Sequence, residues 1–294
     1  MPYYQIKTVQ SSDEKDTYYI YQGNTEKDIQ LNWGYSTARS ILDGLYQLTT
    51  EEDPISLYIY YHNEEIKYFL KNNQRDLLNQ LKAFVPQCGW ESAVSEIDSS
   101  FAKEKVTLRG AASPIVLDNR EENLLDELIR MLPRTPFLIQ VKAEKKNEKE
   151  AREEIQKLEE HINKLSQNAS VQVGEQGHLG ENIKRMVFGG ENLSYQLKNI
   201  TAQKQLDMLE NHLYTLNTQG FIFKSLEYNI YAPEGIAELI AAKMETFSRR
   251  SGSLNLHYLR REPKEYSFEY LNYISSNYAA SILALPMKKT PGIA

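Results

Sequence analysis

The histidines and the single cysteine are the side chains of this sequence that most readily bind metal ions or act as nucleophiles. The histidines are His62, His161, His178, His212 and His257. No two of them have the HxH or HxxxH spacing that brings two imidazoles to one metal ion. Cys88 has no second cysteine to pair with, and we predict that it is a small buried side chain. The sequence therefore predicts no metal site.

Motifs for phosphate binding and acyl transfer are also missing from the sequence. The pattern GxxxxGK[ST] occurs nowhere, and the only glycine pair, Gly189-Gly190, is followed by Glu191 rather than by Lys and Ser or Thr. No GxSxG nucleophile elbow occurs, and the carboxylates form no recognisable acid–base pair. We predict no catalytic, cofactor-binding or metal-binding residue in this chain. An enzyme without a recognisable motif remains an alternative.

Aromatic side chains raise the question of nucleic-acid binding, because rings interleaved with basic residues stack on unpaired bases. The sequence has 20 tyrosines and 9 phenylalanines. Tyr58, Tyr60, Tyr61 and Tyr68 fall in predicted strands beside two glutamates, so we interpret them as half-buried strand residues. The run 142–160 holds six basic and seven acidic residues and predicts a solvated helix face with i,i+4 pairs. Binding of single strands remains the alternative.

Length and composition are those of a soluble globular protein. The chain has 294 residues, of which 41% are hydrophobic and 25% charged, and its net charge is −6. No apolar run approaches the roughly 20 residues that span a bilayer, and the start MPYYQIKTVQSSDEK has no secretory pattern. One cysteine fits a reducing compartment. We expect a cytoplasmic α+β protein without a membrane span.

The first half of the sequence alternates strand and helix patterns. Strands are expected at 17–22, before the Gly23-Asn24 turn, and in a hairpin formed by 55–61 and 66–70. Helices are expected from Ser36 to Leu48, over 77–85 and over 124–132. Short strands are expected at 105–109, 115–117 and 136–141. The second half adds a strand at 221–231, a helix from Pro233 to about 251 and a strand at 254–259, which together predict a βαβ-like unit.

Two long helical patterns in the second half have the most regular spacing in the sequence. Their apolar residues recur at intervals of four and three: Ala151, Ile155, Leu158, Ile162 and Leu165 in the first, and Ala202, Leu206, Leu209, Leu213 and Leu216 in the second. Such spacing places the apolar side chains along one narrow seam, as in packed helix pairs. We predict an antiparallel helical hairpin over about 147–219 that also lies on a sheet, with His161 and His212 at its solvent edges.

These elements predict two mixed α/β subdomains with short sheets, plus the long antiparallel helical pair. The first subdomain is expected over 1–100 and the second, which includes the helical hairpin, over 101–274. Residues 275–294 are expected to form a helix and a linker, because Leu-Pro and Thr-Pro-Gly are typical of linkers.

The C-terminal segment SSNYAASILALP, followed by MKKTPGIA, resembles the segment that precedes the ATPase core of HerA/FtsK-superfamily ATPases. This superfamily includes HerA-type DNA translocases and type IV secretion ATPases. The order of LPRTPFLIQVKAE, a long charged helix, a polar loop, a second long helix and FIFKSLEYNIYAPEGIAELI is also similar to their N-terminal halves. The resemblance covers residues 132–294.

The resemblance implies a non-catalytic N-terminal region that docks a protein partner or assists ring assembly by self-association. In the family the phosphate-binding loop, the acidic magnesium residue and the arginine finger follow the Pro-Gly turn, where this sequence stops. ATP, Mg²⁺ and nucleic acid are then expected only for a downstream motor domain, and this chain is not expected to be an enzyme. A stand-alone protein-interaction scaffold remains the alternative.

Overall fold

A computed structural model describes most of the secondary structure of the chain. The described residues are 3–9, 16–22, 25–31, 33–50, 56–71, 76–86, 88–92, 97–112, 123–145, 147–172, 196–198, 206–207, 209–210, 212–214, 216–217, 222–251, 254–258 and 274–275. Among the described helices, none combines the length and the apolar composition needed to cross a lipid bilayer.

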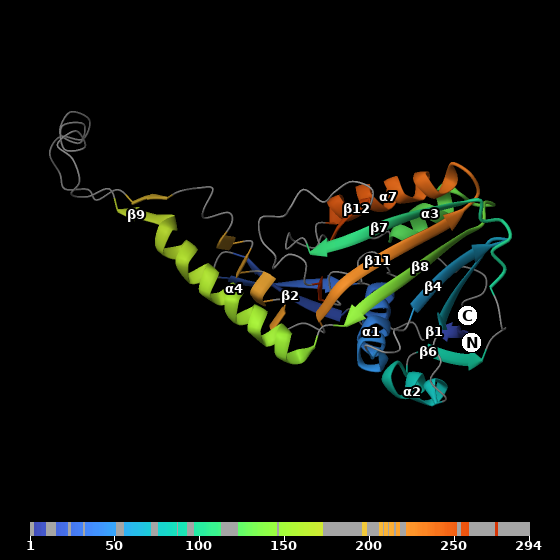
Figure 1. Ribbon diagram of the computed structural model, residues 1–294, viewed down its shortest axis with the longest axis horizontal. Coiled ribbons are helices and arrows are strands. Elements are labelled where there is room, and N and C mark those ends of the chain that lie inside the picture. Colours follow the sequence, from blue (N-terminus) through green and yellow to red (C-terminus); the bar gives the residue numbers. More distant parts are fainter. Residues whose placement is uncertain are drawn as a thin grey trace.

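A single twisted sheet organises the described part of the chain (Figure 1). Eight of its nine described strands follow the order β12-β7-β11-β8-β4-β5-β1-β6, and the ninth, β13, pairs with β11. The strands are β1 (Tyr3–Val9), β4 (Ser56–His62), β5 (Glu65–Lys71), β6 (Cys88–Ser92), β7 (Glu104–Ala112), β8 (Phe137–Lys145), β11 (Ile222–Ala232), β12 (Leu254–Tyr258) and β13 (Ile274–Ser275). Every described pair in this sheet is antiparallel.

The α+β class expected from the sequence is confirmed, but one large sheet extends across both expected subdomains. β4 pairs with β8 from Ser56↔Lys142 to Tyr61↔Phe137, so strands from 1–100 and from 101–274 share the same sheet. Without this pairing, β4 and β8 would each leave the backbone N–H and C=O groups of one edge unpaired. Such an exposed edge on a long apolar strand promotes aggregation. The boundary expected near residue 100 therefore does not interrupt the sheet.

Four described helices contribute to the core on one face of this sheet. They are α1 (Trp33–Leu48), α2 (Leu77–Phe84), α3 (Leu124–Met131) and α7 (Ile236–Ser251). Alternate residues of the strands point towards them, and Tyr61, Phe137 and Tyr228 are among the largest fully buried side chains. Lys243 of α7 also forms an ion pair with the largely buried carboxylate of Glu127 in α3. The helices thus cover this face with apolar contacts and one ion pair.

The βαβ-like unit expected near the C-terminus is present as β11–α7–β12. Both strands pair antiparallel with β7, which lies between them, so β11 and β12 are parallel to each other. β7 is longer than expected and continues through Gly110 to Ala112. Helix α1 also begins three residues before the expected cap at Ser36. The strand expected at 115–117 and the helix expected after residue 275 lie outside the described residues.

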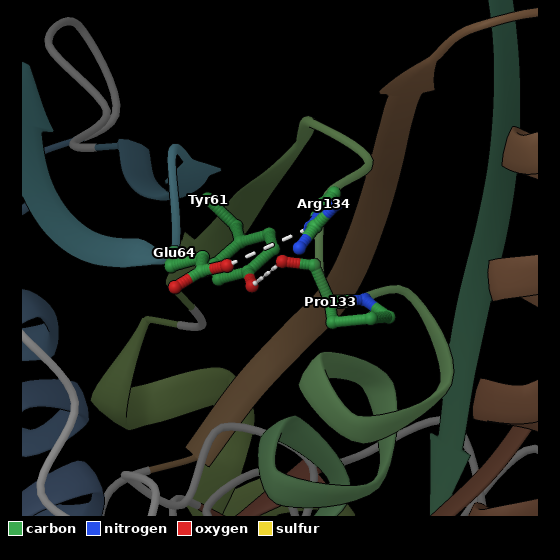
Figure 2. Close-up of polar contacts among 4 residues, drawn as sticks. All are labelled: Tyr61, Glu64, Pro133 and Arg134. Carbon is green, nitrogen blue, oxygen red and sulfur yellow. Dashed lines mark hydrogen bonds and ion pairs between the residues drawn. The ribbon is translucent and has the colours of Figure 1, made fainter.

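The expected hairpin is β4–β5, and its turn is tied to the loop between α3 and β8 (Figure 2). Asn63 and Glu64 both have positive φ, 52° and 64°, as the two central residues of a type I′ turn require. The Tyr61 hydroxyl donates a hydrogen bond of 2.6 Å to the carbonyl oxygen of Pro133. Arg134 Nε lies 3.9 Å from Glu64 Oε1, and both side chains are exposed.

Smaller elements lie outside the main sheet. β2 (Asp16–Gln22) is the strand expected at 17–22, and it pairs antiparallel with β3 (Thr25–Leu31), a strand that the sequence did not predict. Helix α4 (Glu148–Ala169) is followed by β9 (Ser170–Gln172), which pairs with β10 (Gln196–Lys198). Residues 142–145 belong to β8, so only the later part of the charged run 142–160 is helical.

Candidate functional site

The residues of the predicted helical seam gather in one hydrophobic cluster. Ala151, Leu158, Ile162, Leu206, Leu209 and Leu216 are buried in it, and Ile155, Leu165 and Leu213 pack against them. Ala202 lies outside the described residues. We call α4 and the described helical residues between 206 and 217 the helix arm. Its apolar side chains meet at the spacing that the sequence shows.

The helix arm does not lie on the main sheet, contrary to expectation. Among the described side chains, its cluster is separate from the core of the sheet, and α4 extends away from the sheet in Figure 1. The reason lies in the spacing of the apolar residues, which forms one narrow stripe on α4. The described helical residues between 206 and 217 cover this stripe, so α4 has no second apolar stripe that could pack on a sheet.

The outer surface of α4 is charged and exposed. Lys149 Nζ lies 3.9 Å from Glu153 Oε1 at i,i+4 spacing, as expected for a solvated helix face. Lys149 and Glu153, with Asn147, Arg152 and Gln156, line an open groove of about 440 Å³. Two cations and one carboxylate line this groove, so it favours a partner surface of mixed charge over a ligand of one sign.

The second distinctive region is the sheet face opposite the helices, which we call the tyrosine face. Tyr3, Tyr60, Phe69 and Leu138 form a cluster there, and Tyr58, Tyr231, Ile97 and Phe101 pack against it. No described helix contributes a residue to this cluster. Gln140 and Asn229 also point to this face, because their neighbours along β8 and β11 point into the helix-side core.

Strand register arranges the tyrosine face in three rows that cross the sheet. The middle row runs through Thr107, Asn229, Gln140, Tyr58 and Phe69. One flanking row contains Arg109, Glu227, Lys142, Ser56 and Lys71. The other contains Lys105, Tyr231, Leu138, Tyr60 and Lys67. Polar and aromatic groups therefore lie between two rows that carry charges.

Hydrogen bonds link the members of the middle row. Thr107 Oγ1 donates to Asn229 Oδ1 at 2.8 Å, and Gln140 Nε2 donates to the Tyr58 hydroxyl oxygen at 2.9 Å. The Tyr231 hydroxyl donates to Gln140 Oε1 at 3.3 Å. The Nδ2 amino group of Asn229 has no hydrogen-bond partner, although the residue is only 2% exposed. A buried donor without an acceptor is uncommon and costs about 1–3 kcal/mol.

Lysines lie against two of the tyrosine rings. Lys71 Nζ is 4.9 Å from the centroid of the Tyr3 ring and donates to the Tyr3 hydroxyl oxygen at 3.2 Å. Lys105 Nζ is 5.6 Å from the centroid of the Tyr231 ring. The Tyr3 and Tyr58 rings meet edge to face with centroids 5.5 Å apart. Burial, reinforced by the neighbouring hydroxyls of Tyr3 and Tyr231, raises the pKa of Tyr58 to about 12, so this phenol stays protonated at neutral pH.

The four tyrosines singled out in the sequence divide between the two faces of the sheet. Tyr58 is half-buried, as expected, whereas Tyr60, Tyr61 and Tyr68 are buried. Tyr61 and Tyr68 belong to the helix-side core, and burial raises the pKa of Tyr68 well above 10. The other strands bring lysines to the tyrosine face, which local sequence alone did not indicate.

The remaining candidate groups show no arrangement for chemistry within the described residues. No group of three or more His, Cys, Asp or Glu side chains that could hold a metal ion occurs among them. Cys88 is buried as predicted, and burial raises the pKa of its thiol to about 12. His212 is fully buried rather than at a solvent edge, because it lies between seam residues Leu209 and Leu213. His178 and Gly189-Gly190 lie outside the described residues.

Sequence reasoning missed Tyr3, Gln140, Asn229 and Tyr231. A signal was present, because Gln140 and Asn229 are polar residues whose neighbours on both sides along the strand are apolar or aromatic and point into the helix-side core. Their register opposite each other could not be read from either strand alone.

Comparisons with protein-family models, curated proteins and solved structures give no match for this chain.

Proposed function

We propose that this chain is a non-catalytic docking module, the N-terminal region of a HerA-like ATPase, and that it acts in the cytoplasm. The observation that carries the docking role is the helix arm, whose hydrophobic cluster is separate from the core of the sheet. The arm would bind a protein partner or a second copy during ring assembly. ATP and Mg²⁺ would bind the motor domain and not this chain.

The form of the helix arm supports this role. The apolar side chains of its seam are buried within the arm, since Leu158 and Leu209 are 1% and 0% exposed. Its outer surface is left with charged and polar side chains, including Lys149, Glu153 and Gln156. Such a surface suits a reversible interface of mixed charge, which gains specificity and association rate from electrostatic complementarity.

Excision of the helix arm tests the proposal. Lys145 at the end of β8 lies opposite Phe223 near the start of β11, and such antiparallel partners have Cα atoms about 5 Å apart. Residues 147–219 can therefore be replaced by a short Gly-containing turn. The excised protein is expected to retain the strand signal in far-UV circular dichroism and the thermal unfolding of the sheet.

Sedimentation velocity then compares association of the full and excised chains. The full chain is expected to self-associate below ~100 µM, a modest affinity for a protein interface, and the excised chain to stay monomeric. The matched control is Arg134→Ala, an exposed site in the loop between α3 and β8, which should associate like the parent. A full chain that stays monomeric contradicts ring assembly through this module. Equal association of both chains contradicts the role of the helix arm.

Two further observations separate the HerA-like module from a stand-alone scaffold. The coding sequence after residue 294 should contain GxxxxGK[ST] within about a hundred codons if a P-loop motor follows. The purified 294-residue chain should hydrolyse no ATP. An immediate stop codon without a neighbouring ATPase would favour the scaffold, and saturable hydrolysis by the purified chain would contradict both interpretations.

A further inference from the structure

The side of α4 that points away from the seam carries a row of exposed polar and charged side chains. Residues three and four positions apart lie next to one another on a helix. We use the name charged face for six exposed residues that follow this spacing: Lys149, Arg152, Glu153, Gln156, Glu159 and Glu160. The first four of them belong to the lining of the open groove. The charged face contains no apolar side chain, so charge and hydrogen bonding determine what it binds.

Charges of opposite sign are separated along the charged face. Both of its cations, Lys149 and Arg152, lie in the first half, before Gln156. The one carboxylate of that half, Glu153, already pairs with Lys149 at 3.9 Å. The second half carries two carboxylates, those of Glu159 and Glu160. The charged face is therefore positive towards the start of α4 and negative beyond Gln156.

A second copy of α4 that runs in the opposite direction complements this order of charges. If a two-fold axis passes through Gln156, residues equally far before and after position 156 face each other across the contact. Arg152 then meets Glu160 of the second copy, with Glu159 of that copy beside it, and the symmetry forms this contact twice. The two Gln156 amides, which both donate and accept hydrogen bonds, meet at the axis. A parallel copy would instead place Arg152 beside Arg152 and Glu160 beside Glu160, which is repulsive.

Helix geometry brings the facing residues within reach. Helix axes in packed pairs lie about 8–10 Å apart, and Cα atoms lie about 2.3 Å from their own axis. The two facing Gln156 Cα atoms would then be roughly 4–6 Å apart. In Figure 1, α4 extends away from the main sheet, so the described sheet does not cover the charged face.

We propose that the charged face of α4 binds the same face of a second copy of this chain, antiparallel and with Gln156 on the two-fold axis. This inference rests on the self-association proposed for the helix arm, and it specifies the surface and the orientation. A two-fold contact closes with two copies. It therefore joins subunits in pairs, and a ring links such pairs through other surfaces.

Charge reversal tests the pairing across the axis by sedimentation velocity in low-salt buffer. Arg152→Glu turns both symmetry-related attractions into repulsions and should weaken dimerisation about 10-fold. Glu160→Arg should weaken it similarly. The double variant Arg152→Glu/Glu160→Arg restores opposite charges across the axis and should dimerise within about 2-fold of the parent. Arg134→Glu makes the same change of net charge at an exposed site off the arm, so it should dimerise like the parent.

Disulfide cross-linking tests the orientation. Gln156→Cys places two thiols at the axis, where the Cα separation suits a disulfide. Asn163→Cys is the matched control, because Asn163 is an exposed amide side chain two turns further along the same side of α4. Its two copies would lie about 21 Å apart in the antiparallel pair. The native Cys88 is buried and does not compete. Non-reducing gel electrophoresis should show a covalent dimer for Gln156→Cys and not for Asn163→Cys.

The outcomes separate this inference from the docking role of the helix arm. Single reversals that dimerise like the parent, a double variant as weak as the single ones, or equal cross-linking of Gln156→Cys and Asn163→Cys would each overturn the antiparallel contact. If excision of residues 147–219 still abolishes association in that case, the arm docks through another surface and its proposed role stands. A full chain that stays monomeric contradicts both the self-association of the arm and this contact.

Discussion

The main sheet and the helix arm bury their apolar side chains in different ways. In the sheet, alternate residues of strands from both halves of the chain meet four described helices in one continuous core. In the arm, one stripe of α4 meets one stripe of a second helical region and forms a small separate cluster. The sheet core is built from many distant segments, whereas the arm core is built from two. This difference predicts that the arm unfolds without the sheet, but that the sheet does not survive loss of its own core.

The largest effect is expected from truncation in the sheet core. Phe137 is fully buried and stacks on Tyr61 with ring centroids 5.1 Å apart. Phe137→Ala should lower the free energy of unfolding by about 3–5 kcal/mol, because it removes buried apolar surface and leaves a cavity. Urea unfolding followed by far-UV circular dichroism measures this loss. A change below ~1 kcal/mol would show that the surrounding side chains move to fill the cavity, and it would contradict a closely packed core.

A charge in the seam should have a large but local effect. Leu158→Asp or Leu209→Asp places an unpaired carboxylate in the arm cluster and should destabilise the arm by several kcal/mol, roughly 3–4. The loss in helical circular dichroism should precede unfolding of the sheet. Gln156→Asp, exposed on the same helix, serves as the control. If either seam variant melts at the same temperature as the parent, the burial of Leu158 and Leu209 between the two helical segments is contradicted.

Alkaline pH should weaken the sheet through Cys88. Burial raises the pKa of its thiol from 9.0 to about 12, so the folded state holds the proton more tightly than the unfolded state. The resulting stability is fully present below pH 9 and is lost as the pH rises towards 12, at about 1.4 kcal/mol for each pH unit. Between pH 9 and 10, Cys88→Ala should lose less stability than the parent. If the free energy of unfolding of the two proteins falls equally with pH, the claim that burial raises the pKa of the Cys88 thiol is contradicted.

The smallest effect is expected at the exposed hairpin pair. Arg134 and Glu64 are 90% and 67% exposed, so water screens their attraction. Arg134→Ala should change the free energy of unfolding by less than ~0.5 kcal/mol, in both salt-free and high-salt buffer. A larger, salt-dependent loss in urea unfolding would mean that the loop between α3 and β8 is held by this pair rather than by Tyr61.

Local sequence patterns were sufficient for elements whose partners are near in the chain or regular in spacing. The β4–β5 hairpin, α3 and the β11–α7–β12 unit follow from alternation, turn residues and helical periodicity. The seam of the helix arm follows from the four–three spacing, because that spacing puts Leu158 and Ile162 on one side of α4.

Pairing between distant strands could not be read from these patterns. Ser56 lies opposite Lys142, and nothing in either segment specifies the other as its neighbour. The tyrosine face depends on such pairings, since Asn229, Gln140 and Thr107 come from three strands that are far apart in sequence. The expectation that the arm also lies on a sheet fails for the main sheet, and the reason is related. Periodicity shows which side of α4 is buried, but not whether a helix or a sheet buries it.

Hydrogen exchange of Leu158→Asp followed by mass spectrometry tests the independence of the helix arm most directly. Amides of α4 should lose their protection in this variant, while amides of β8 and β11 should exchange as slowly as in the parent, because the two clusters are separate. Simultaneous loss of protection in α4, β8 and β11 would show that the arm and the sheet unfold as one unit and would contradict the account.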